Sequence, residues 1–148
     1  MKIQISNLQS AVLAPLSPVR QVARSISSKL ARSDALTLDT LSIAIVDDTE
    51  IARVNWQFLR HRGPTDVITF DYSNGHGKMG EIIISAETAQ VQARRHRRPL
   101  AEELSRYVIH GLLHLAGYDD KTPAQRREMR IAENELLRSS RPKGNRHG

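Results

Sequence analysis

Cysteine is absent from the 148-residue sequence. The chain can therefore form neither a disulfide nor a zinc site built on thiolates, and this absence fits a reducing compartment, so we expect a cytoplasmic protein. Aromatic residues make up only 4% of the chain, which leaves aliphatic side chains to build the core. The length is that of one domain with a real core, which we place at residues 1–138, followed by a basic, disordered tail at residues 139–148.

Long hydrophobic runs are also absent. No stretch approaches the roughly 18–20 apolar residues that a membrane-spanning helix needs. The N-terminal segment MKIQISNLQSAVLAPL contains no uninterrupted apolar run of the length found in signal peptides. We therefore expect no membrane partner.

Acidic residues are too few to balance the basic ones, and the imbalance is local. The formal net charge is +6. Residues 1–90 hold nine basic and nine acidic side chains, whereas residues 91–148 hold thirteen basic and seven acidic ones. A basic surface of this kind suits a polyanionic substrate, most commonly nucleic acid, although arginine-rich helices are often simply solvated faces.

Hydrophobic periodicity predicts interleaved strands and helices. Four strands are indicated, at Lys2–Ser6, Leu41–Val46, Val67–Phe70 and Glu81–Ser85. Five helices are indicated, at Pro18–Ala31, Glu50–Leu59, from Ser85 to about Arg95, at Leu100–Ala116, and from Pro123 to about Leu137. Since the glycine-rich turn Asn74–Gly80 joins two strands directly, we expect an α+β fold with a mixed sheet of about four strands packed by about five helices.

The most specific chemical signal lies in the segment VIHGLLHLAGYDD, within a helix apolar enough to be central and largely buried. His110 and His114 are four residues apart, which places both imidazoles on one helix face with Cβ atoms about 5–6 Å apart. Gly117 can adopt a positive φ, so the helix can stop and the chain can fold back. Either Asp119 or Asp120 could then return to the same metal ion.

Zinc is the leading candidate for this ion because imidazole and carboxylate suit it, although manganese, nickel and iron accept the same ligands. Three protein ligands would leave a position open for water, as in catalytic zinc sites. A lone histidine on a helix is more often a hydrogen-bonded structural residue. Two at this spacing, followed by glycine and paired acids, favour a metal site.

A zinc metalloprotease is a competing interpretation of the same spacing. Proteases of the H-E-x-x-H-x-x-G-x-x-H type share the positions of the two histidines and the glycine. Gly111, however, stands where those enzymes carry the glutamate that acts as the base. The missing carboxylate disfavours this interpretation.

Three segments together resemble the YbeY family of bacterial metal-dependent endoribonucleases. HGLLHLAGYDD at His110–Asp120 is similar to the family's H-G-x-L-H-L-x-G-Y-D-H, PTDVITF at Pro64–Phe70 to P-T-D-V-L-S-F, and GEIIIS at Gly80–Ser85 to G-D-I-x-I. The spacing of Met129, Glu133 and Leu136 in the last helix also follows the family. The resemblance implies a single metallo-hydrolase domain that cleaves single-stranded RNA in ribosomal RNA maturation and ribosome quality control, with the small ribosomal subunit as a partner.

The resemblance also implies a ligand set, in which His110, His114 and Asp120 hold one zinc ion. Asp120 stands where the family usually has a third histidine, and carboxylate is an adequate ligand for zinc. The carboxylate would lower the net charge of the site by one and make a bound water less acidic. Asp119 matches the aspartate of the family motif and is the less favoured ligand.

Arginine side chains would position the RNA backbone without reading its sequence, chiefly Arg60, Arg62 and the cluster Arg94–Arg98. Many family members carry an arginine four residues after the asparagine matched here by Asn55. This chain has Leu59 at that position, and Arg60 follows it with a rotation of about 100° on a helix.

No general base stands out, and the weak catalytic candidates are Arg60, Glu81 and Asp66. A second interpretation is a non-catalytic protein associated with the ribosome or RNA, whose metal is structural or vestigial. The aspartate at position 120 keeps that interpretation open.

Overall fold

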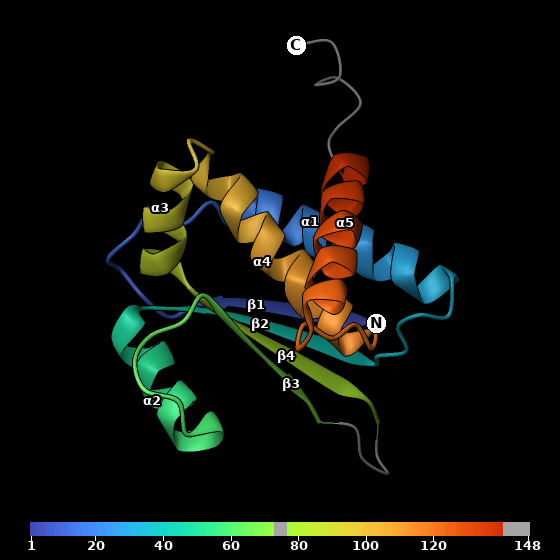
Figure 1. Cartoon of the computed structure of the whole chain (residues 1–148), viewed down its shortest axis with the longest axis horizontal. Coiled ribbons are helices and arrows are strands. Elements are labelled where there is room, and N and C mark those ends of the chain that lie inside the picture. The colour runs from blue at the N-terminus through green and yellow to red at the C-terminus, as the bar shows by residue number, and fades with distance from the viewer. Residues whose placement is uncertain (73–76, 141–148) are drawn as a thin grey trace.

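The computed structural model describes residues 1–72 and 77–140 of the chain. In order these residues form β1 (Lys2–Asn7), α1 (Leu16–Arg32), β2 (Thr40–Val46), α2 (Asp48–Leu59), β3 (Val67–Asp71), β4 (Met79–Ser85), α3 (Ala86–Arg95), α4 (Leu100–Leu115) and α5 (Pro123–Ser140) (Figure 1). The kinds and order of the elements predicted from hydrophobic periodicity are confirmed.

The strands form one mixed sheet in the order β1-β2-β4-β3. β1, β2 and β4 are parallel, as expected for strands whose connections pass through helices, whereas β3 pairs antiparallel with β4 at an edge. The expected α+β class and the neighbouring pair of strands are therefore confirmed. Of the predicted turn Asn74–Gly80, residues 74–76 lie outside the described residues.

Side chains that alternate along the strands build a core on each face of the sheet. Ile82 and Ile84 of β4 join the larger core, formed with α1, α4 and α5, whereas Ile83 between them faces α2. Figure 1 shows these three helices on one side of the sheet and α2 on the other. The smaller core beneath α2 consists of Val46, Ile51, Val54, Ile68 and Ile83.

Helix α4 lies at the centre of the helical layer, in contact with the sheet and with α1, α3 and α5 (Figure 1). Leu104, Val108, Ile109 and Leu112 are fully buried, which confirms the predicted central helix. Gly111 allows the close approach to the sheet, because a Cβ at this position would lie 2.7 Å from Cδ1 of Ile82.

The C-terminal helix continues further than the sequence predicted. α5 ends at Ser140, two residues into the segment expected to be a disordered tail from residue 139 onward. The hydroxyls of Ser139 and Ser140 donate to the carbonyl oxygens of Leu136 and Leu137, three residues earlier in the helix. Residues 141–148 of that segment lie outside the described part of the chain.

None of the helices in residues 1–72 and 77–140 combines the length and the hydrophobicity that crossing a bilayer requires.

Candidate metal centre

Two imidazoles meet on one face of α4. His110 and His114 come from successive turns of the helix, and their Nε2 atoms lie 3.1 Å apart. The ring planes are inclined by 74°, so the two nitrogens converge instead of stacking. The i, i+4 spacing therefore produces the shared face that the sequence predicted.

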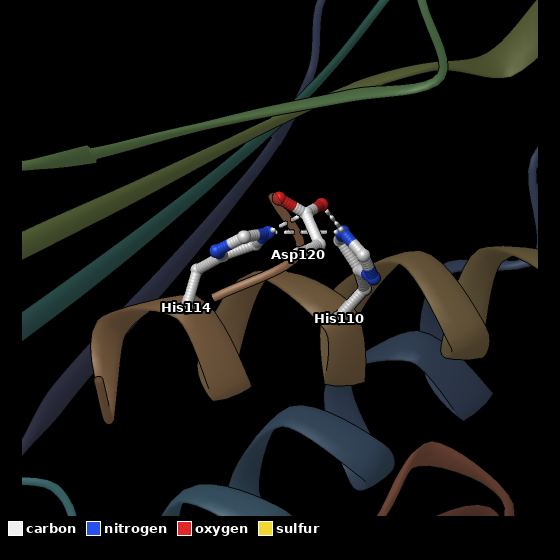
Figure 2. A group of neighbouring side chains, drawn as sticks. All are labelled: His110, His114 and Asp120. Atoms are coloured by element: carbon white, nitrogen blue, oxygen red, sulfur yellow. Dashed lines mark hydrogen bonds and ion pairs between the residues drawn. The ribbon is translucent and has the colours of Figure 1, made fainter. Parts of the chain in front are cut away.

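A tight turn after α4 brings a carboxylate back to these rings. Gly117 has a φ of +101°, and its N–H donates to the carbonyl of His114 while Tyr118 N–H donates to that of Leu113. This pair of hydrogen bonds is a Schellman turn, which reverses the chain at a residue with positive φ. Asp120 Oδ2 then lies 3.3 Å from His114 Nε2 and 3.7 Å from His110 Nε2 (Figure 2).

The neighbouring acid does not join this group. Oδ1 of Asp119 accepts a hydrogen bond from the backbone N–H of Asp120 at 2.9 Å, and its Oδ2 lies 3.8 Å from Nζ of Lys121. Asp120 is thus the carboxylate that the structure places with the histidines, and Asp119 instead stabilises the turn.

The three side chains fit a divalent ion. Their ligand atoms all lie within 4.8 Å of one another. Around a tetrahedral zinc ion with ligands at roughly 2.0–2.2 Å, neighbouring ligand atoms are roughly 3.3–3.6 Å apart. The observed separations of 3.1, 3.3 and 3.7 Å bracket that range.

Glu133 of α5 holds one of the two rings. Its carboxylate contacts Nδ1 of His110 in a short hydrogen bond. Burial opposes the charged form of His110, but the hydrogen bond to Glu133 and the negative charges of Glu133, Asp66 and Asp120 together raise its pKa. A proton kept on Nδ1 leaves the Nε2 lone pair directed toward Asp120 and His114, as a metal ligand requires.

Sequence reasoning assigned no role to Glu133. Its spacing with the buried Met129 and Leu136 places it on the inward side of α5, and it is 15% exposed. A carboxylate among apolar positions of a helix expected to pack on α4 was the available signal.

The group opens onto clefts on two sides. One cleft of about 390 Å³ runs along β3, and we call it the β3 cleft; it includes Leu59, Asp66, Asp71, His110, His114 and Asp120. A second, of about 350 Å³, lies between α4 and α5, and we call it the arginine cleft; it includes Arg98, Glu103, Arg106, Tyr107, His110, Arg130, Glu133 and Asn134. With His110 and His114 about a quarter exposed, a ligand can reach the group.

The weak catalytic candidates are separated by the fold. Asp66 lines both clefts beside His110 and accepts a hydrogen bond from Val67 N–H. Glu81 does not reach the centre: it lies with Ile83 on the α2 face of the sheet, where Tyr72 OH donates to it at 3.4 Å. The sheet therefore stands between Glu81 and the histidines.

Arg60 lines neither the β3 cleft nor the arginine cleft. It is the left-handed C-cap of α2, and its guanidinium lies over Trp56, 5.6 Å from the ring centroid. Arg62 lies over the same ring at 5.4 Å. The side chain from this region that lines the β3 cleft is Leu59.

Of the arginines in the basic cluster Arg94–Arg98, only Arg98 lines one of the two clefts. Arg98 lines the arginine cleft and lies 3.8 Å from both Glu102 and Glu103. Arg94, Arg95 and Arg97 are exposed at the end of α3 and line neither of the two clefts.

Known proteins with a similar sequence cover most of the chain. A protein from Bacteroides fragilis, named endoribonuclease YbeY, is 46% identical over 90 residues, which are 61% of this chain and 65% of the relative. A protein of the same name from Syntrophus aciditrophicus is 35% identical over 145 residues, which are 93% of this chain and 88% of the relative. The chain thus spans slightly less than two thirds of the Bacteroides fragilis protein.

A solved structure has the same fold. The solution structure of TM1509 from Thermotoga maritima superposes with a TM-score of 0.64 at 24% identity, over 93% of this chain and 88% of that one. The family model described as endoribonuclease YbeY matches residues 4–141. The chain therefore belongs to the endoribonuclease YbeY family.

Proposed function

We propose that this protein is a metal-dependent endoribonuclease that hydrolyses phosphodiester bonds of single-stranded RNA. Its setting would be the cytoplasm, in the maturation and quality control of ribosomal RNA, with the small ribosomal subunit as partner. The observation that carries the proposal is the convergence of His110, His114 and Asp120 at an open cleft in a chain of this family.

The chain's own residues would prepare this site in distinct ways. His110, His114 and Asp120 would hold a divalent ion, for which we propose zinc, and the ion would supply positive charge that polarises a phosphoryl oxygen and acidifies a water. Glu133 keeps His110 in the tautomer that presents Nε2. Of the weak catalytic candidates, Asp66 is the carboxylate within reach of the same clefts, so we propose it as the proton acceptor.

A peptidase is not supported by the packing at Gly111. The proteases with related spacing need a glutamate there, but a Cβ at Gly111 would already collide with Ile82 of β4. A side chain at this position requires α4 or Ile82 to shift, so this rival lacks its base and would have to displace a buried side chain to gain one.

A non-catalytic RNA-binding protein remains a second candidate because two positions depart from the family pattern. Asp120 replaces the usual histidine, and Leu59 replaces the arginine that would line the β3 cleft. A structural metal would need neither an acidified water nor an arginine contact to RNA, which are the two properties that these replacements affect.

Elemental analysis combined with RNA cleavage separates the two candidates. Protein purified without added metal should contain zinc and should cleave unstructured RNA. His114→Ala should abolish cleavage while leaving cooperative unfolding intact, and the matched control His61→Ala, at an exposed loop position, should retain activity. Equal RNA loss with wild type and His114→Ala would indicate a contaminating nuclease and favour the non-catalytic protein.

A further inference from the structure

The arginine cleft extends from His110 along the same face of α4 toward the N-terminus of the helix. Arg106 and His110 are four residues apart, which is about 6 Å along a helix axis. Arg98 enters from the α3–α4 connection and Arg130 from α5, so three guanidinium groups from three segments border one cavity that ends at His110.

Two residues that line this cleft each carry a buried donor atom with no partner in the described part of the chain. These donors are Nε of Arg106 and the hydroxyl of Tyr107, a residue that is only 7% exposed. Buried polar atoms in folded proteins are nearly always hydrogen-bonded, to protein or to water, so each of these two donors needs an acceptor.

The acids of the cleft do not form ion pairs with all of its arginines. Glu133 is bonded to His110, Asp66 to the backbone of Val67, and Glu103 lies near Arg98. Arg106 donates one bond, from Nη1 to Asn134 Oδ1 at 3.0 Å. Arg130 is exposed and makes no hydrogen bond or ion pair with any residue in the ranges 1–72 and 77–140.

The β3 cleft, on the opposite side of the centre, is acidic. It is bordered by Asp66, Asp71 and Asp120, and no lysine or arginine of the described residues lines it. The arginine cleft therefore offers a phosphate guanidinium groups beside its acids, whereas the β3 cleft offers only acids.

We propose that the arginine cleft is a phosphate subsite that binds the backbone phosphate next to the scissile one. Arg106 and Arg130 contact its oxygens, Tyr107 OH and Arg106 Nε supply the unsatisfied donors, and Arg98 adds charge at the rim. The RNA strand is thereby held on the α4–α5 side of the centre. The identity of the ligand as RNA rests on the proposed function.

The first test measures binding of a single-stranded RNA oligonucleotide to metal-free protein, so that cleavage does not interfere. Arg130→Gln should weaken binding roughly fivefold to tenfold and reduce the slope of log affinity against log salt by about 0.7, as expected for one lost phosphate contact on a single strand. Arg127→Gln is the matched control, since Arg127 is exposed on the same helix but does not line the cleft. Equal weakening by both variants would overturn the proposal.

The second test locates the phosphate. Single methylphosphonates, which remove one backbone charge, are placed at successive positions of the oligonucleotide. In wild type, the substitution next to the scissile position should weaken binding, and in Arg130→Gln that same substitution should have no further effect. If every substitution keeps its full effect in Arg130→Gln, the arginine does not contact a defined phosphate and the proposal fails.

Tyr107→Phe separates binding from packing. Loss of the hydroxyl should weaken RNA binding and raise KM while leaving kcat and the unfolding midpoint unchanged. Unchanged RNA affinity would contradict the assignment of this hydroxyl to the subsite.

These outcomes also distinguish the subsite from the proposed function. Wild type that binds RNA without cleaving it, with binding weakened in Arg130→Gln, would retain the subsite and reject the nuclease. Wild type that cleaves RNA, with equal KM in Arg130→Gln and Arg127→Gln, would retain the nuclease and reject the subsite.

Discussion

Glu133 of α5 is hydrogen-bonded to Nδ1 of His110 on α4, across 23 residues of sequence. The contact joins the last helix to the metal-facing stripe of the central one. Because it fixes both the tautomer and the ring orientation of His110, the metal affinity of the site depends on a residue that is itself no ligand.

Replacement of Glu133 should therefore weaken metal binding without abolishing it. We expect Glu133→Gln to lower zinc affinity roughly 10–100-fold, the range found for partners that orient a metal-binding histidine. Competition against a chromophoric chelator measures this. Glu135→Gln, an exposed change two residues along the same helix, should leave the affinity unchanged, and an equal loss in both variants would point to general electrostatics.

The metal-free protein should lose stability as the pH rises through the raised pKa of His110. The folded-state pKa of His110 is raised above 6.5, so its contribution is fully present below the unfolded-state pKa and is lost as the pH rises through the folded value. Urea unfolding of chelator-treated protein across this range should report the decline, and Glu133→Gln should flatten it. Metal affinity should move in the opposite direction, because protons compete for His110.

The contact between Gly111 and Ile82 should make a small substitution costly. Gly111→Ala places a methyl group against a buried isoleucine and should destabilise the fold by roughly 1–3 kcal/mol, partly offset by the better helix propensity of alanine. Ile82→Ala should also destabilise, but the double variant should cost less than the sum because the new methyl fills the space left behind. Strict additivity in denaturant titrations would show that the two side chains do not compete for space.

The turn at Gly117 should control the return of Asp120. Alanine at a φ of +101° is strained, so Gly117→Ala should cost roughly 1–2 kcal/mol and should weaken zinc binding by displacing the carboxylate. Gly117→Asn, which tolerates a left-handed conformation better, should lie between wild type and alanine. Lost stability with unchanged zinc affinity would mean that Asp120 reaches the site by another route.

Local patterns predicted what local chemistry determines. The spacing of His110 and His114, the stop at Gly117 and the apolar surface of α4 are all encoded within one segment, and the structure reproduces each of them. The predicted helix ended at about Leu137 because polar residues near a charged terminus resemble a loop. In the structure the helix continues to Ser140, and the hydroxyls of Ser139 and Ser140 bond to carbonyl oxygens of its last turn.

The remaining features depend on tertiary contacts or on the direction of a side chain. Three consecutive isoleucines follow Glu81, so hydrophobic alternation could not reveal that Glu81 faces α2 and not the histidines. The pairing of Glu133 with His110 depends on how two helices pack. The stacking of Arg60 on Trp56 follows from a left-handed cap at the end of α2 that the sequence did not indicate.

Calorimetric titration of metal-free protein with zinc tests the three-ligand centre most directly. Wild type should bind a single ion per chain. Asp120→Ala should weaken binding more than about a hundredfold, because a lost ligand costs more than a lost orienting contact. Asp119→Ala should weaken it far less, because Asp119 contacts the backbone of the turn and not the ion. Equal zinc affinity in wild type and Asp120→Ala would contradict the account.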